Sequence, residues 1–243
     1  MIRLASLGWW LLFLVLLPLL LPQAVLTRRR ALRLPPAAGA QSGVAGSFAG
    51  EPLRLLLLGE STVAGVGVDC QRDALAGQLA GQLALQLQRP VAWQAQGENG
   101  ITAGEALVRL VPQVAGEPVD LVLLVFGVND TTHFSSNRRW LAAMQALADC
   151  FSAADCRVAF AAVPPIRHFS ALPWLLRSVL GLRAALLDRQ LQALAEKLSA
   201  VHCAVRMEFA AQYLARDGYH PSAAGYRVWA EGLSVLLAGR LAG

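Results

Sequence analysis

Ser61 is the first residue of the chain whose type and position favour chemistry. It follows the apolar run Leu55–Leu58, which is typical of a strand buried on both faces of a parallel sheet. Open α/β sheets bind their ligands beyond the carboxyl ends of such strands, so a serine at this point is a candidate nucleophile. Ser61 or Thr62 could instead cap the helix that follows.

Asp217 and His220 have the spacing of a general base and the carboxylate that orients it. A serine hydroxyl is a weak nucleophile until a base removes its proton, and His220 is the candidate base. Asp217 lies three residues earlier, close enough to accept a hydrogen bond from Nδ1–H and to stabilise the imidazolium. The same residues are also typical of a simple turn before a surface histidine. The other three histidines, at positions 133, 168 and 202, show no partner pattern, and we expect structural roles for them.

Hydrogen-bond donors for a developing negative charge come from three places in the chain. The backbone N–H groups of Ser61 and Gly100 and the side-chain amide of Asn129 are the candidates for this oxyanion hole. Gly100 ends the segment Gly-Glu-Asn-Gly before a predicted helix, and Gly104 is an alternative to it. Asn129-Asp130 alone would be ordinary turn residues, with Asp130 supporting the loop.

These side chains require a fold that gathers the ends of several strands. Apolar, strand-like runs alternate along the chain with helical patterns, and Thr102 and Glu105 have the spacing of a capping box. The pattern predicts a three-layer α/β/α sandwich with a five-stranded parallel sheet. The predicted strands are 53–58, 91–96, 119–126, 157–163 and 205–209, and the predicted helices start near 73 and 102 and span 138–152, 172–201 and 222–238.

Taken together, the four polar segments resemble the SGNH hydrolase (Gly-Asp-Ser-Leu esterase/lipase) superfamily over roughly residues 52 to 240. Gly-x-Asn-Asp at 127–130 and Asp-x-x-His-Pro at 217–221 are jointly specific for it. The resemblance implies a flavodoxin-like fold and no cofactor or metal. It also implies a catalytic group of Ser61, Asp217 and His220 and an oxyanion hole of Ser61, Gly100 and Asn129. Glu60 stands where the family usually has Asp, and its extra methylene could shift the hydrogen bonds around the nucleophile.

The first 33 residues are predicted to be a membrane anchor. Residues 4–27 are uncharged and apolar, long enough to cross a bilayer as a transmembrane helix, with Trp9 and Trp10 as candidate interfacial anchors. Residues 34–51, rich in Ala, Gly, Pro and Ser, are predicted to be a flexible linker before an esterase domain at 52–243. A cleaved signal peptide is the alternative, but its positive charge would precede the apolar core.

Charge is distributed unevenly around this anchor. Arg28, Arg29, Arg30 and Arg33 follow the apolar stretch and only Arg3 precedes it, which predicts a cytoplasmic catalytic domain, with a periplasmic one as the alternative. Beyond residue 50 the chain holds 16 basic and 16 acidic residues, so the net charge of +5 gives no reason to expect a nucleic-acid partner. The four cysteines lack zinc-like spacing, and a Cys150–Cys156 disulfide would require an oxidising compartment.

The sequence thus predicts a membrane-anchored serine esterase that forms an acyl-serine intermediate. The anchor and the apolar segment after residue 164 favour a lipid or lysophospholipid substrate, and small acyl esters remain open. Phe169, Leu172, Trp174 and Leu175 could form the wall of an acyl pocket, or simply begin a core-facing helix. The alternatives are an acyltransferase that uses the same site and an inactive, membrane-tethered binding module with the same fold.

Overall fold

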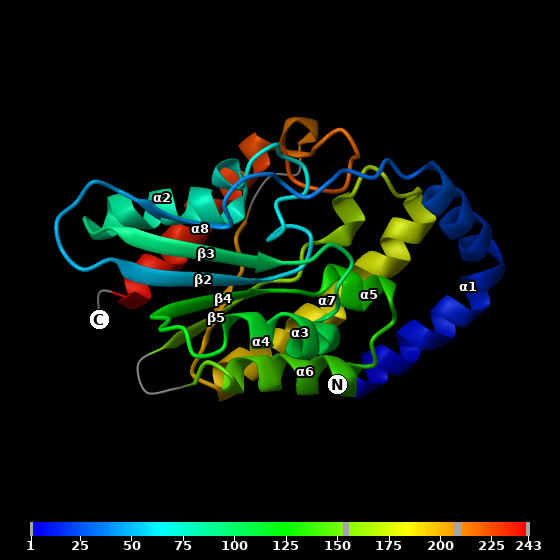
Figure 1. The fold of residues 1–243 in the computed structure, drawn as a ribbon. Coiled ribbons are helices and arrows are strands. Elements are labelled where there is room, and N and C mark those ends of the chain that lie inside the picture. The colour runs from blue at the N-terminus through cyan, green and yellow to red at the C-terminus, as the bar shows by residue number, and fades with distance from the viewer. Residues whose placement is uncertain (1, 153–155, 207–209, 242–243) are drawn as a thin grey trace.

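A central sheet of six strands organises the molecule, with helices covering both faces (Figure 1). The computed structural model describes residues 2–152, 156–206 and 210–241. The strand order is β1-β3-β2-β4-β5-β6; five strands are parallel, and β1 pairs antiparallel with β3 at one edge. The strands are β1 Ser42–Ala45, β2 Leu53–Gly59, β3 Val91–Gly97, β4 Leu121–Val125, β5 Arg157–Ala161 and β6 Val201–Cys203.

Strand β2 shows why the chain forms two hydrophobic cores. Leu55 and Leu57 belong to the core on one face of the sheet, and Leu56 and Leu58 belong to the core on the other face. Successive side chains of a strand point to opposite faces, so an uninterrupted apolar run is what a strand covered on both sides requires. The prediction of a parallel α/β/α architecture is therefore confirmed, with one additional antiparallel strand.

The helices divide between the two faces. Helices α2 (Leu75–Leu87) and α8 (Ala223–Leu241) pack together on the core that contains Leu55, and α3 (Ala103–Arg109), α6 (Asn137–Asp149) and α7 (Trp174–Lys197) cover the opposite core. Thr102 caps α3 with the predicted capping box, because its side chain accepts from the Glu105 N–H and its own N–H donates to the Glu105 carboxylate. The short elements are α4 Val111–Val114, α5 Val128–Thr132 and the 3₁₀ turns η1 Gln71–Asp73, η2 Ile166–His168 and η3 Ala211–Tyr213.

Two segments differ from the sequence-based expectation. The last parallel strand is β6 at Val201–Cys203, whereas it was expected at 205–209; Val205 lies outside any strand, and 207–209 lie outside the described residues. Within 34–51, the expected flexible linker, residues Ser42–Ala45 form strand β1 along β3. Gly43 lies opposite Trp93 in this pair, and the Trp93 ring would be only 3.1 Å from a β-carbon at position 43, so glycine gives the ring room.

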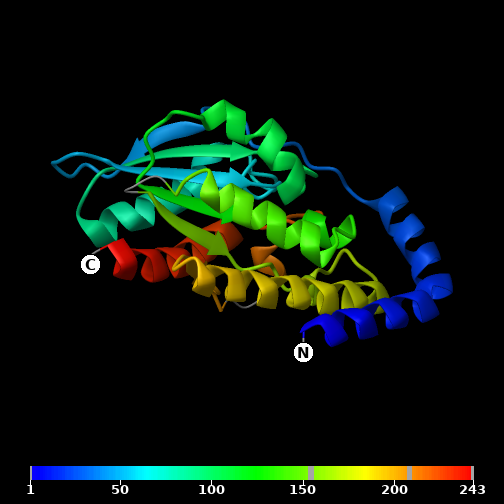
Figure 2. The same ribbon diagram turned by 90° about the horizontal axis from the view of Figure 1, so that it is seen from below.

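Helix α1 (Ile2–Arg30) lies outside the sandwich and packs against α7. Figure 2 shows its first half running beside α7 and its second half turning away. The helix contains Pro18 and Pro22, and proline is a common cause of such bends. Trp9, expected to sit at a membrane interface, is instead 4% exposed, and its indole N–H donates to the Val179 carbonyl at 2.8 Å.

Arg183 of α7 contacts the N-terminal part of α1, near Trp9. Its guanidinium carbon lies 4.8 Å from the Trp9 ring centre and 5.3 Å from that of Trp10, and its Nη2 donates to the Ser135 carbonyl. Burial lowers the pKa of Arg183 to about 10. These contacts join α1 to the sandwich, yet most of its other apolar side chains, such as Leu11 and Leu14, remain exposed.

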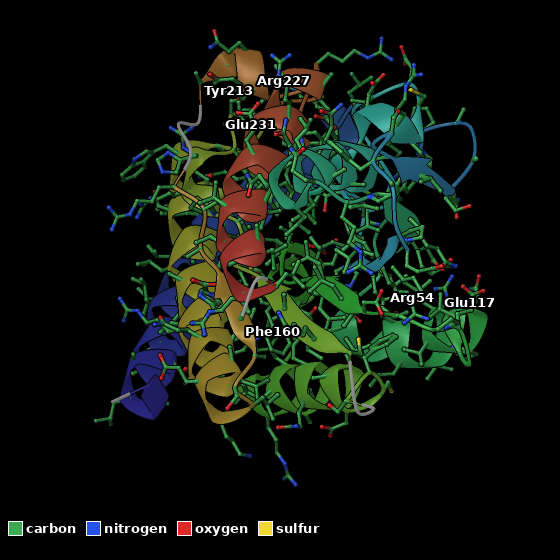
Figure 3. All side chains as sticks on the ribbon, turned by 90° about the vertical axis from the view of Figure 1, so that its left-hand side faces the viewer. Arg54, Glu117, Phe160, Tyr213, Arg227 and Glu231 are labelled. Atoms are coloured by element: carbon green, nitrogen blue, oxygen red, sulfur yellow. The ribbon has the colours of Figure 1, made fainter. Side chains whose placement is uncertain are left out.

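The parallel strands end on the side of the molecule that α1 occupies, as the arrowheads in Figure 1 show. The opposite edge, where the strands begin, faces the viewer in Figure 3, which labels Arg54 there. Arg54 is ion-paired with Asp120 and connects β2 to the start of β4. Every candidate site residue follows a strand at the carboxyl edge or lies in the loop before α8, so the fold itself gathers them.

Candidate functional site

Ser61, His220 and Asp217 form a continuous hydrogen-bonded series. His220 Nε2 lies 3.0 Å from Ser61 Oγ, and His220 Nδ1 lies 2.6 Å from Asp217 Oδ2. Ser61 and His220 are 159 residues apart in sequence, so this geometry arises only in the folded chain. The arrangement can move a proton from the serine hydroxyl to the imidazole while the carboxylate fixes the tautomer.

The carboxylate of Asp217 is held by backbone as well as by the histidine. Asp217 Oδ1 accepts hydrogen bonds from the N–H groups of Tyr219 at 2.9 Å and His220 at 3.0 Å. Burial opposes ionisation of Asp217, but these bonds and that from the His220 side chain outweigh it and hold the pKa of Asp217 below its usual value. The carboxylate therefore stays charged, as a group that stabilises an imidazolium must.

The turn that carries Ser61 is hydrogen-bonded to the last helix, α8. The Tyr226 hydroxyl on α8 donates to the Val66 carbonyl at 2.7 Å, and the Val66 N–H donates to the Ser61 carbonyl at 3.0 Å. Gly67 follows with φ +107°, and the Pro221 carbonyl lies where a side chain at position 67 would be. Only glycine permits both this positive φ and so short a distance to the Pro221 carbonyl. Gly67 therefore allows the serine turn and the histidine loop to lie in direct contact.

Glu60 links the serine turn to the loop of Asn129, which the sequence did not predict. Its two carboxyl oxygens accept from the backbone N–H groups of Val128 at 3.0 Å and Asn129 at 2.9 Å. Glu60 is only 3% exposed, and burial raises its pKa to about 8 in spite of these two bonds. With Glu at this position, where the family usually has Asp, the side chain accepts from two successive amides.

Two further hydrogen bonds fix the loop of Asn129. Asn129 Nδ2 donates to the Ile101 carbonyl at 3.0 Å, and the Ala103 N–H donates to Asp130 Oδ2 at 3.0 Å. Asp130 is therefore a supporting residue, as expected. An amide nitrogen carries two hydrogens, and the bond to the Ile101 carbonyl uses one of those on Asn129 Nδ2.

The backbone donors expected at the site are available for a ligand. Within the described part of the chain, neither the Ser61 N–H nor the Gly100 N–H donates to another protein group. Gly100 adopts φ +86° in the turn before α3, with open space on its α-carbon. Gly104, the alternative, lies inside α3. The turn conformation and the free N–H favour Gly100.

An apolar cavity of about 180 Å³ opens beside Ser61 and His220. Its lining includes Val163, Phe169, Tyr219 and Trp229, and also Tyr213 of η3, a residue that Figure 3 labels. Phe169 packs against Tyr219 with ring centres 4.8 Å apart and ring planes tilted by 59°, and this contact supports one wall.

The other three residues expected in an acyl pocket lie elsewhere. Leu172 lines a separate groove, and Trp174 is 71% exposed. Leu175 packs against the hydrophobic core that α3, α6 and α7 cover. The physical reason is that α7 begins at Trp174, and its helical periodicity carries only every third or fourth side chain to one face.

The remaining candidates take structural positions. His202 Nε2 lies 2.9 Å from Asp188 Oδ1, and the same carboxylate oxygen accepts from the Val163 N–H. All four cysteines are free thiols, including the pair at 150 and 156. Among the residues that the structure describes, no three His, Cys, Asp or Glu side chains gather in a way that could hold a metal ion.

Comparison with solved structures finds the same fold in several hydrolases. A lipase/acylhydrolase from Enterococcus faecalis is 20% identical, with 77% of this chain and 96% of that chain covered and a TM-score of 0.63. The psychrotrophic esterase EstA from Pseudoalteromonas sp., solved in a form inhibited by monoethylphosphonate, is 18% identical, with 78% and 99% covered and a TM-score of 0.60. LAE5, an alpha/beta hydrolase enzyme from the metagenome of Lake Arreo, is 18% identical, with 82% and 98% covered and a TM-score of 0.57.

Sequence comparison supplies the family. A search of curated proteins found no match. The model of the GDSL-like lipase/acylhydrolase family, however, matches residues 57–228, a stretch that holds the serine turn, the Asn129 loop and the Asp217–His220 loop. The chain therefore belongs to the GDSL-like lipase/acylhydrolase family, within the SGNH hydrolases, and is a serine hydrolase that acts on esters.

Proposed function

We propose that the chain is a membrane-anchored esterase that cleaves carboxylic esters through an acyl-Ser61 intermediate. The observation that carries this proposal is the series Ser61–His220–Asp217, with contacts of 3.0 Å and 2.6 Å. His220 takes the proton of Ser61 Oγ as the hydroxyl attacks the carbonyl carbon, and Asp217 stabilises the imidazolium. The same histidine then gives that proton to the leaving alcohol, and later activates a water that releases the acid.

The tetrahedral intermediate is stabilised by three donors in this proposal. They are the N–H groups of Ser61 and Gly100 and the amide of Asn129, each from a different strand end. Such donors act most strongly where water is excluded, and removal of one typically costs about 100- to 1,000-fold in kcat. Glu60 positions this hole, since it binds the backbone of Asn129 and directly precedes Ser61.

The acyl group is proposed to occupy the apolar cavity. Its wall of Val163, Phe169 and Trp229 offers hydrophobic contact, and its volume of about 180 Å³ suits a short or medium chain more than two full lipid chains. Esters with one acyl chain, such as lysophospholipids, or smaller acyl esters therefore fit best.

The anchor is proposed to be α1. It is the single helix in the described chain that is long and apolar enough to cross a membrane, and signal sequences share these properties. Its packing on α7 through Trp9 favours an interfacial position in one leaflet, because a helix held along the sandwich cannot also span the bilayer. The arginines after α1 favour a cytoplasmic domain.

Covalent labelling with a fluorophosphonate probe tests the nucleophile. The wild-type chain should label, and Ser61→Ala should not label while keeping its circular dichroism spectrum. Ser178→Ala is the matched control, since Ser178 lies on the exposed side of α7 and donates only to the Trp174 carbonyl. Undiminished labelling of folded Ser61→Ala would rule out the assignment.

Carbonate extraction and reporter fusions test the anchor. The full chain should stay with the membrane pellet, and a reporter that works only in the cytoplasm should be active when fused to its C-terminus. Activity of a reporter that works only in the periplasm, or a Cys150–Cys156 disulfide in protein from cells, would contradict the predicted side.

A further inference from the structure

A second and larger cavity reaches the catalytic histidine. This groove of about 810 Å³ lies between the C-terminal end of α1, the segment at 170–173 and the loop at 216–220. Tyr219 and His220 line both the groove and the acyl cavity, whereas Ser61 lines only the acyl cavity. The two cavities therefore adjoin at Tyr219 and His220.

The groove is positively charged. Arg28, Arg30 and Arg216 are exposed and line it, and its lining contains a single carboxylate, Asp217, which is bound to His220. Within the described residues, none of the three arginines forms an ion pair with an acid. Arginines from two segments that are far apart in sequence thus surround one hollow, where their mutual repulsion would be relieved by an anion.

The direction of the reaction says which part of the substrate enters this groove. When Ser61 Oγ bonds to the acyl carbon, the bond from that carbon to the alcohol oxygen breaks. The proton moves from Ser61 Oγ to His220 Nε2 and then to the departing alcohol oxygen. The alcohol must therefore leave beside His220, where the groove begins, while the acyl group stays in the apolar cavity.

We propose that the groove binds the alcohol portion of the substrate, and that Arg28, Arg30 and Arg216 select esters whose alcohol carries a phosphate group. This inference rests on the proposed function of Ser61 and His220. Guanidinium groups match phosphate oxygens with paired, charge-assisted hydrogen bonds. Leu26, Leu32 and Leu172 line the same groove and can cover the carbon atoms between phosphate and ester. Part of α1 thereby contributes to specificity as well as to anchoring.

The test compares two water-soluble esters with the same short acyl chain, one of glycerol and one of glycerol phosphate. The full chain in a neutral detergent is assayed as wild type, Arg30→Gln, Arg216→Gln and Arg29→Gln. Arg29 is the matched control, because it lies on the same helix as Arg30 and carries the same charge but does not line the groove; it lines a neighbouring hollow with Arg28 and Arg33. The measured quantity is the ratio of kcat/KM for the phosphate ester to that for the neutral ester.

We expect this ratio to fall about 10-fold in each groove variant, the effect of one charge-assisted hydrogen bond, and to change little in Arg29→Gln. Added salt should also lower the wild-type ratio, since the groove arginines are exposed.

Three results would overturn the inference. The first is an unchanged ratio in both groove variants, and the second is an equal loss in Arg29→Gln, which would indicate only a general positive field. The third is a loss of binding to anionic-lipid vesicles with no change in the ratio, which would assign the arginines to the bilayer. Failure of the proposed function is distinguishable, because then neither ester is cleaved and Ser61 does not label.

Discussion

Glu60 should make the stability of the fold fall as the pH rises. Its folded-state pKa is raised from 4.5 to about 8 by burial, so between these values the folded protein holds a proton that the unfolded chain has released. Stability decreases with pH wherever the folded state binds more protons. The contribution of Glu60 is therefore fully present below about pH 4.5 and is lost as the pH rises to about 8.

The size of this loss follows from the two pKa values. Integrating the difference in bound protons from about pH 5.5 to about pH 8.5 gives a decrease of about 3 kcal/mol in the free energy of unfolding. The substitution Glu60→Gln removes the titration, so the difference in unfolding free energy between wild type and variant isolates it. Urea unfolding of the full chain in a nonionic detergent, followed by tryptophan fluorescence across this pH range, measures that difference.

Glu105→Gln is the control for this series. Glu105 is exposed, and its hydrogen bonds with Thr102 lower its pKa. The stability that Glu105 contributes is lost only below its unfolded-state pKa. The difference in unfolding free energy between Glu105→Gln and wild type should therefore be constant over the same pH range. If the wild type and Glu60→Gln also differ by a constant amount, Glu60 is ionised throughout, and the two backbone N–H bonds outweigh burial.

Three further perturbations test other parts of the structure. Asn129→Ala should lower kcat on an activated ester by about 100- to 1,000-fold with little change in KM, as measured by steady-state kinetics, and a change in KM alone would make Asn129 a binding residue. Gly67→Ala should lower both the Tm and the activity, because φ +107° and the Pro221 carbonyl leave no place for a methyl group; an unchanged Tm would contradict this close approach. Arg183→Ala should release α1 from the sandwich and speed proteolysis after residue 30, as followed by mass spectrometry, whereas an unchanged cleavage rate would show that Arg183 does not hold the helix.

The candidate site could be proposed from the sequence because its signals are local. A short apolar run followed by Gly-Glu-Ser, and an Asp three residues before a His, are each ambiguous alone, but together with Gly-x-Asn-Asp they indicate a serine hydrolase. The parallel architecture then brings Ser61 and His220 together, since all its strands end at one edge.

Other features depend on contacts between distant segments and have no local signal. Glu60 binds Val128 and Asn129, which lie 68 and 69 residues away, and Trp9 binds the Val179 carbonyl 170 residues away. Strand β1 could not be predicted, because its segment has a composition typical of linkers. Strand β6 has only three residues, which are too few to show a periodic pattern. The groove beside His220 is formed by α1 and two loops, so its lining could not be read from any one stretch.

The short strands at the two edges of the sheet have a consequence for the behaviour of the protein in concentrated solution. An exposed, long edge strand is a template on which another chain can add a strand, and such additions lead to aggregation. Here β1 has four residues and β6 has three, and the antiparallel β1 covers the seven-residue edge of β3. The sheet therefore offers little backbone for intermolecular pairing, and self-association of the purified chain should arise from the exposed leucines of α1, which a detergent can shield.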